Sequence, residues 1–84
     1  MAKRLVGIVR HFYPKIGVAV VDVESDFSVG DRVSFEGPNT DLVQTVESIQ
    51  VDGKSADSAK KGIQVAIKTN GVVHLEDHLY LEPD

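Results

Sequence analysis

The sequence predicts an all-β protein: a small closed antiparallel β-barrel of about six strands, Greek-key-like, with one short helical turn near residues 55–61. Three observations lead to this fold class. β-Branched runs fill residues 5–9 and 16–23, apolar and polar residues alternate over residues 31–36, and glycine-containing turns separate the segments. A small β-sandwich is the main alternative. The chain is expected to form a single domain, residues 1–84.

The composition restricts the class of function. The 84 residues include no cysteine, which removes disulfides, thiolate zinc ligands and a cysteine nucleophile. No apolar run reaches the ~20 residues of a membrane span, and the N-terminus lacks the apolar core of a secretion signal. We therefore expect a soluble cytoplasmic protein. The net charge of −4 argues against strong non-specific binding to nucleic acid.

The charges are unevenly distributed along the chain. Four cations precede the first acid, Asp22, and four acids lie within residues 76–84. If the two ends lie on opposite sides of the domain, one face is basic; otherwise the charges are scattered over a solvated surface. The cations are Lys3, Arg4, Arg10 and Lys15, and the acids are Glu76, Asp77, Glu82 and Asp84.

A hairpin of two strands, residues 5–12 and 15–23, is expected to open the fold. Pro14 ends the first strand or lies in the turn, because proline donates no ladder hydrogen bond. Alternation along the second strand then leaves Asp22 pointing outward. The residues of this strand expected to face the core are Gly17, Ala19, Val21 and Val23.

The outer face of this hairpin is too apolar to lie in water if it is continuous. Either residues 52–62 cover it or another protein does. Its residues are Val6, Ile8, Ile16, Val18 and Val20, of which Ile8, Ile16, Val18 and Val20 form the predicted protein-interaction site.

Four later segments are expected to complete the sheet: residues 31–36, 42–51, 63–68 and 78–82. In the second of these the apolar residues break strict period two, which predicts a β-bulge near Glu47-Ser48. The inward residues of the later strands are Val33, Phe35, Val46, Val65 and Ile67. Together Val9, Val21, Phe35, Val46 and Val65 are expected to share one dry interior.

Two local signals lie between these strands. Ser55 is expected to cap a short helical turn through Lys61, with Gly62 as its left-handed end. Asn70-Gly71 is a signal for a two-residue hairpin turn, which would pair residues 72–75 with the preceding strand.

Short motifs along the chain resemble a known family. They are Val6-Gly7-Ile8-Val9, Gly17-Val18-Ala19-Val20-Val21, Val29-Gly30-Asp31-Arg32-Val33, Val46-Glu47-Ser48-Ile49, and Ala59-Lys60-Lys61-Gly62 followed by Val65. This pattern resembles the second-domain β-barrel of translational GTPases such as elongation factor Tu, and above all the small translation elongation factor-like proteins that consist of this barrel. Similar barrels end a family of collagenase-like peptidases, some of whose members act in tRNA modification. The resemblance covers residues 5–82 and implies a loop, not a hairpin, at residues 70–78.

The resemblance implies a non-enzymatic binding module that docks on RNA, either tRNA or the ribosome, or on a translation-associated protein. The nucleotide-hydrolysing domain of the GTPases has no counterpart, so neither GTPase activity nor a bound nucleotide is expected. The alternative is a protein-interaction accessory domain that acts in trans for a collagenase-like peptidase or a tRNA-modifying protein. No cofactor is expected in either case.

Cations and aromatic rings meet at the first turn. Such a group can contact a phosphate backbone and stack an unpaired base. Alternatively, Phe12 or Tyr13 closes the end of the barrel while the cations are solvated. The predicted nucleic-acid-binding residues are Arg10, His11, Phe12, Tyr13 and Lys15.

Other patterns that could carry chemistry are weaker. Gly53-Lys54-Ser55 lacks the first glycine of a phosphate-binding loop, since Ser48 stands at that position. In an extended segment His74, Glu76 and His78 would share a face and could bind zinc, but the segment is interrupted by turn residues, so no metal site is assigned. No serine lies in a nucleophile-elbow context, so no catalytic residue is assigned and no enzyme is expected.

Overall fold

The computed structural model describes residues 3–82, which form ten β-strands and no helix. Accordingly, the described part of the chain contains no helix long and apolar enough to cross a membrane. The all-β class predicted from the sequence is confirmed. The strands are β1 (Arg4–Tyr13), β2 (Val18–Val23), β3 (Phe27–Ser28), β4 (Arg32–Gly37), β5 (Thr40–Thr45), β6 (Ile49–Val51), β7 (Lys54–Ala56), β8 (Ser58–Ala59), β9 (Gln64–Lys68) and β10 (His78–Leu81).

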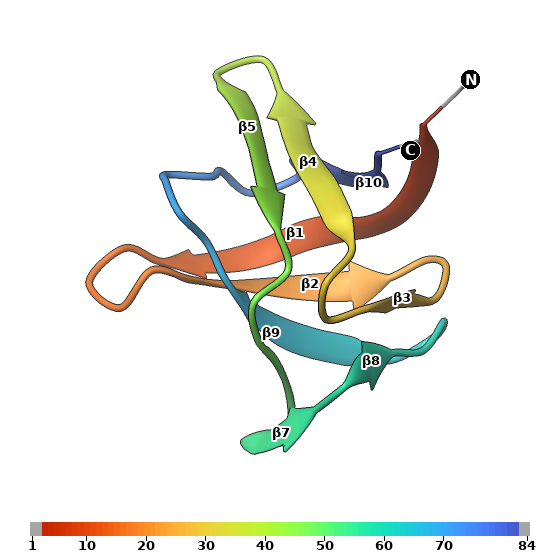
Figure 1. Ribbon diagram of the computed structural model, residues 1–84. Coiled ribbons are helices and arrows are strands. Elements are labelled where there is room, and N and C mark those ends of the chain that lie inside the picture. Colours follow the sequence, from red (N-terminus) through yellow and green to blue (C-terminus); the bar gives the residue numbers. More distant parts are fainter. Residues whose placement is uncertain (1–2, 83–84) are drawn as a thin grey trace.

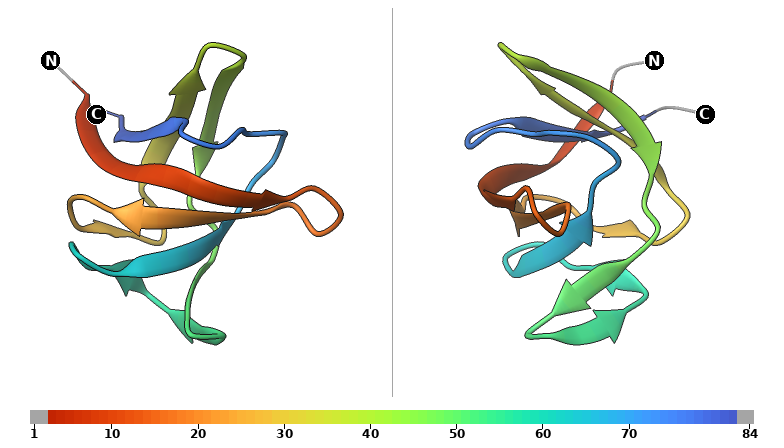
Figure 2. Two further views of the ribbon diagram at one scale, coloured as in Figure 1. Left: turned by 180° about the vertical axis from the view of Figure 1, so that it is seen from behind. Right: turned by 90° about the vertical axis from the view of Figure 1, so that its left-hand side faces the viewer.

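Eight strands form one antiparallel sheet in the order β5-β4-β10-β1-β2-β9-β6-β7, and β3 pairs with β8 in a second, two-stranded sheet. The large sheet is rolled around the core (Figure 1, Figure 2). The predicted closed barrel of about six strands is not formed, because β5 and β7 remain as edges and no ladder joins them. Instead the chain itself links the two sides: β5 pairs with β4, and β6, which follows it, pairs with β9.

The segment from residue 42 to residue 51 is not one bulged strand. β5 ends at Thr45 and β6 begins at Ile49, so the bulge predicted near Glu47-Ser48 is wrong. A bulge lies instead at Gly30-Asp31, just before β4, where two residues face the single residue Val46. The Val46 N–H donates to the Asp31 carbonyl at 2.8 Å, and the Val46 carbonyl accepts the Gly30 N–H at 2.9 Å. Gly30 has a φ of +96°, which glycine adopts without steric cost and which is typical of the first residue of such a bulge.

The helical turn predicted near residues 55–61 is also wrong, because β7 and β8 occupy this segment. Asp52 and Gly53 have positive φ angles of 52° and 79°, and Val51 pairs with Lys54 across them. This is the geometry of a two-residue hairpin turn, which an Asp-Gly pair favours. The turn therefore overrides the weaker capping signal at Ser55.

The hairpin predicted at Asn70-Gly71 is not formed, and residues 69–77 are a loop, as the resemblance implied. Neither Asn70 nor Gly71 has the positive φ that the hairpin turn would need. The Asn70 N–H donates to Gln44 Oε1 at 2.8 Å, and the Thr69 N–H donates to the Gly17 carbonyl at 2.8 Å. Long-range hydrogen bonds thus determine the conformation against the local signal.

The five residues expected to share one interior do so: Val9, Val21, Phe35, Val46 and Val65 are each at most 2% exposed. The rest of the apolar core consists of Val6, Ala19, Val23, Phe27, Val33, Ile49, Ala59, Ile67, Val73 and Leu79. Of the residues in the later strands and in β2 that were expected to face inward, seven in β2, β4 and β9 are buried: Ala19, Val21 and Val23 of β2, Val33 and Phe35 of β4, and Val65 and Ile67 of β9. Gly17 is an exception, because it lies in the turn before β2 and is half-buried. Burial does not alternate along β4, since Ser34 is fully buried as well.

Val6 belongs to this core, so its predicted place on the outer face of the hairpin is wrong. β1 shifts register against β10 between Leu5 and Gly7, and against β2 between Val9 and His11. An extra residue in a ladder changes which side chains face inward. Val6 and Val9 therefore both point to the core, although they lie three positions apart.

Candidate interaction surface

The β1–β2 hairpin projects from the body of the sheet and presents its tip to solvent (Figure 1). The N–H groups of Ile16 and Gly17 both donate to the Tyr13 carbonyl, at 3.3 and 2.9 Å. Gly17 has a φ of +65°, which returns the chain into β2. The turn leaves Ile16 63% exposed and Tyr13 46% exposed.

The loop of residues 69–77 lies at the same end of the molecule as this tip (Figure 1, Figure 2). Three backbone hydrogen bonds attach it to the hairpin: the Thr69 N–H donates to the Gly17 carbonyl at 2.8 Å, the Glu76 N–H donates to the Val9 carbonyl at 2.9 Å, and the Val9 N–H donates to the Asp77 carbonyl at 2.9 Å. The hairpin tip and the loop therefore form one surface.

This surface holds the three most exposed large hydrophobic side chains of residues 3–82, which are Val72 at 65%, Ile16 at 63% and Leu75 at 59%. A groove of about 480 Å³ runs between the loop and β1, and a hollow of about 260 Å³ lies on the tip. The groove is lined by His11, Phe12, Val73, His74 and Leu75, and the hollow by Tyr13, Pro14, Lys15 and Ile16.

Asp77 holds the loop against the sheet. Its side chain is 2% exposed, and its Oδ2 accepts the His74 N–H at 2.7 Å. Gly37 on β4 makes room for this carboxylate, because a Cβ at Gly37 would overlap Asp77 Oδ1. A buried, hydrogen-bonded carboxylate fixes the backbone beneath it. The exposed residues of the loop are thus presented in a defined conformation.

Arg10, the first of the predicted nucleic-acid-binding residues, is engaged within the molecule. Its Nε donates to Asp22 Oδ2 at 2.6 Å, and its Nη1 lies 3.0 Å from Glu76 Oε2. The hydrogen bond with Asp22 raises the pKa of Arg10 above its usual value and lowers that of Asp22. These carboxylates compete with any phosphate for the guanidinium.

The other four predicted nucleic-acid-binding residues gather at the groove and the tip. The rings of His11 and Tyr13 lie 4.3 Å apart between centroids, with planes inclined by 50°. Phe12 packs against the core, as the alternative interpretation held, and Lys15 is exposed. The role of these residues in binding RNA stays a prediction.

Of the predicted protein-interaction residues, only Ile16 is exposed. Ile8, Val18 and Val20 are half-buried, so the apolar surface is concentrated at the tip of the hairpin and not along its whole outer face.

Sequence reasoning missed Val72 and Leu75 because residues 72–75 were assigned to a strand. The available signal was the adjacent pair Val72-Val73. Two consecutive apolar residues in a strand cannot both face one core.

The charge distribution does not produce a basic face of the predicted cations. Arg4 on β1 pairs with Leu81 on β10, so the two ends of the described chain lie side by side. Lys3 contacts Glu36 and lies 3.0 Å from Glu82. The contact with Glu36, followed by that with Glu82, raises the pKa of Lys3, and Lys3 in turn lowers the pKa of both carboxylates.

We expect the domain to become less stable in acid, because protonation of the carboxylates breaks these ion pairs. Asp22, Glu36 and Glu82 have folded-state pKa values below their unfolded values. They therefore contribute stability above an unfolded pKa of about 4, and this stability is lost as the pH falls through the lower folded pKa. The melting temperature, measured by circular dichroism at a series of pH values, should be constant near neutral pH and fall below about pH 4. Lys3→Met should weaken this fall, because Glu36 and Glu82 lose their partner; an unchanged acid profile would contradict the assignment.

The residues considered for zinc do not converge. Glu76 is bound to Arg10, and His78 Nδ1 lies 3.2 Å from the Tyr80 hydroxyl. His74 Nδ1 lies 2.7 Å from Thr40 Oγ1. Within residues 3–82 no group of three or more histidine, aspartate or glutamate side chains is arranged to hold a metal ion.

Thr40, His74 and Asp77 lie close together but do not form a nucleophile–base–acid relay. Thr40 Oγ1 is 2.7 Å from His74 Nδ1, and Asp77 Oδ2 is 3.8 Å from the same nitrogen. A relay needs the nucleophile and the acid on opposite ring nitrogens. Thr40 is also buried, at 7% exposure, so the arrangement is structural.

Comparison with known proteins relates this chain to one family. Residues 2–78 match the family described as peptidase family U32 C-terminal domain. The chain is 36% identical over 77 residues to an uncharacterized protease of Methanocaldococcus jannaschii, a match that covers 90% of this chain and 19% of that protein. The chain thus spans about a fifth of the length of this relative.

Solved structures agree with this match. The C-terminal domain of a Geobacillus thermoleovorans protein assigned to the U32 peptidases gives a TM-score of 0.89 at 28% identity, covering 95% of this chain and 93% of that one. Its selenomethionine variant gives a TM-score of 0.87 at 28% identity, covering 92% of this chain and 98% of that one.

Proposed function

The chain belongs to the family of U32 peptidase C-terminal domains, and from this premise we propose that it is a non-catalytic protein-docking domain. Its partner in this proposal is the catalytic part of a collagenase-like peptidase or of a tRNA-modifying protein, which it serves in trans. The relationship to the translational GTPase barrel stays a prediction.

One observation supports docking more than any other. The three most exposed large hydrophobic side chains of the described residues, Ile16, Val72 and Leu75, lie on one surface beside a groove. Burying a side chain of this kind contributes about 1.5–3 kcal/mol. Tyr13, which is 46% exposed, adds an aromatic side chain of the type enriched in interfaces. Such a surface is suited to a protein partner with apolar anchors.

The same surface is less suited to RNA. Arg10 is paired with two carboxylates, and the Tyr13 ring already contacts His11. The most exposed large hydrophobic side chains are aliphatic, whereas a platform for unpaired bases relies on aromatic rings and on cations along the backbone path. Binding of RNA is therefore kept as the competing outcome of the test.

The test uses the 84-residue chain as an immobilised bait in a nuclease-treated lysate of its source organism, with captured U32-family proteins quantified by mass spectrometry. Ile16→Glu and Val72→Glu should each reduce the capture at least about tenfold, since a charge then replaces an apolar anchor. Ile63→Glu and Val29→Glu are the matched controls. They introduce the same change at residues that are 38% and 41% exposed and lie outside the hairpin tip and the 69–77 loop. They should leave capture unchanged.

If Ile16→Glu and Val72→Glu both still capture a U32-family protein, the docking site does not lie on this surface. The same capture is repeated in a lysate without nuclease. Capture of no such protein in either lysate would contradict the docking function. Capture only in the untreated lysate would favour RNA, and a titration with tRNA followed by NMR would then show shifts at residues 10–15.

A further inference from the structure

β5 is a long sheet edge with little protection. It is the terminal strand of the eight-stranded sheet and runs for six residues, Thr40–Thr45. Its hairpin with β4 projects from the body of the molecule (Figure 1). The β4–β5 ladder has no register shift, and β5 contains neither lysine nor proline. Bulges, lysine and proline are the usual means of blocking an edge, so an edge that lacks them is a template for another strand.

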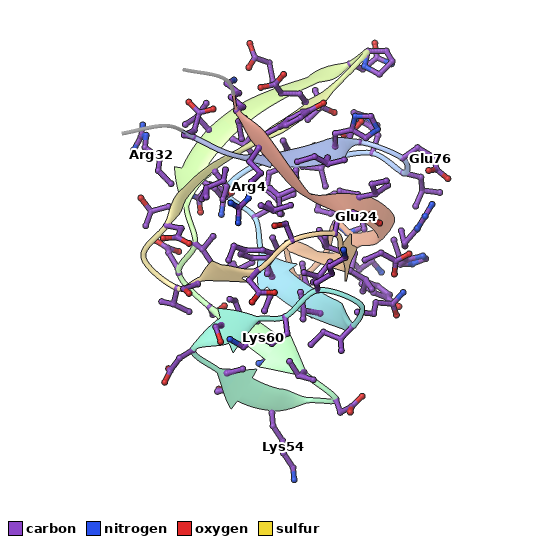
Figure 3. The ribbon with its side chains drawn as sticks, turned by 90° about the vertical axis from the view of Figure 1, so that its right-hand side faces the viewer. Arg4, Glu24, Arg32, Lys54, Lys60 and Glu76 are labelled. Carbon is purple, nitrogen blue, oxygen red and sulfur yellow. The ribbon has the colours of Figure 1, made fainter. Side chains whose placement is uncertain are left out.

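The opposite edge, β7, has this protection. It is three residues long and begins with Lys54, whose side chain extends away from the body of the molecule (Figure 3). A short strand and a lysine both discourage the addition of a further strand. The contrast singles out β5 as the open edge.

The backbone of β5 places hydrogen-bonding groups on this free edge. Gly37 and Thr40 pair across the two-residue turn of the hairpin and therefore exchange hydrogen bonds with each other. Alternation then turns the N–H and C=O groups of Asp41, Val43 and Thr45 away from β4. Within residues 3–82 these groups have no backbone partner in another segment. All three side chains are exposed, Val43 by 41%.

We propose that β5 pairs with β5 of a second copy of this chain, in an antiparallel ladder centred on Val43. The strand is self-complementary in this register, because Val43 faces its own counterpart and Asp41 faces Thr45. A carboxylate thus meets a hydroxyl that can donate to it, and no like charges meet across the twofold axis. About six backbone hydrogen bonds join the two copies.

Charge complementarity selects this register over its neighbours. Centring the ladder on Gln44 would bring Asp41 opposite Glu47, a pair of like charges. Centring it on Leu42 would place the Asp41 carboxylate against Val43, which offers no hydrogen bond. β5 adjoins the loop of the docking surface, since Thr40 Oγ1 lies 2.7 Å from His74 Nδ1 and Gln44 Oε1 accepts the Asn70 N–H at 2.8 Å. The two proposals are tested at different residues, Val43 here and Ile16 and Val72 for docking, so the failure of one can be told from the failure of the other.

Sedimentation equilibrium of the 84-residue chain tests the pairing. The apparent mass should rise from the monomer value of 9.1 kDa toward twice that value between micromolar and millimolar concentration. Val43→Lys should raise the dissociation constant at least about tenfold, since two ammonium groups then face each other across the axis. Val29→Lys is the matched control, because Val29 is also 41% exposed and lies outside β5.

A second variant separates a lost dimer from a lost fold. Val43→Pro removes an edge N–H that β4 does not use, so the monomer should stay folded by circular dichroism while the dimer weakens. A chain that stays monomeric up to millimolar concentration would overturn the proposal. So would a dimer that both Val43 variants leave as tight as the wild type, because its interface would then lie elsewhere.

Discussion

Replacing Phe35 by alanine is expected to destabilise the domain by about 3–5 kcal/mol. Phe35 is the largest fully buried side chain of the described residues. It lies on β4 between Leu42 of β5 and Leu79 of β10, so its ring is enclosed by strands on both sides. The loss is a large part of the total stability of a small domain, about 5–15 kcal/mol, so the variant should be partly or wholly unfolded at physiological temperature.

Urea unfolding followed by far-ultraviolet circular dichroism measures this effect, since the chain has no tryptophan. Phe12→Ala is the matched control, because Phe12 is only half-buried at the edge of the core and should cost much less. Phe35→Leu keeps most of the volume and should fall between the two. If Phe35→Ala unfolded at the wild-type urea concentration, Phe35 would not be part of the core.

The second large effect is expected from the smallest change, Gly7→Ala. A Cβ at Gly7 would overlap Val21 Cγ1 and lie 3.1 Å from the Asp22 carbonyl oxygen, both on the neighbouring strand β2. Gly7 and Val21 are buried in a closely packed interior, so neither can move without displacing its strand. The added methyl group should therefore destabilise the domain by about 1–3 kcal/mol.

The same urea experiment checks this prediction with a control and a double mutant. Gly71→Ala should be nearly neutral, because its Cβ would make an ordinary contact of 3.5 Å with Leu42. Val21→Ala removes the overlapping atom. The double variant should therefore lose about 1 kcal/mol less of its free energy of unfolding than the sum of the losses of the two single variants. Strict additivity would show that Val21 is not the obstacle.

The Asp-Gly and Asn-Gly pairs show how far local sequence determines a turn. Both are signals for a two-residue hairpin, but only Asp52-Gly53 adopts the positive φ angles that this turn needs. Asn70-Gly71 has the same local preference and is held in a loop by Gln44, 26 residues away in the chain. A local signal determines the structure where no distant partner competes for the same backbone groups.

In the candidate interaction surface, too, some residues could be identified from the sequence and others only from the structure. The cluster of residues 11–15 could be found from the sequence because its members are contiguous. Its neighbours Val72 and Leu75 reach it only through the hydrogen bonds of the 69–77 loop to β1 and Gly17. The neutralisation of Arg10 also depends on Glu76, 66 residues further along the chain. These relations cannot be read from spacing.

The sequence by itself determined the all-β class and the inward face of most strands, because side chains alternate along a strand as a property of its own backbone. Only the tertiary structure decided where the sheet stays open, which cations are paired and which loop meets the hairpin tip. Each of these depends on hydrogen bonds and ion pairs between segments that are distant in the chain. Their energies are comparable to the local preferences that they override.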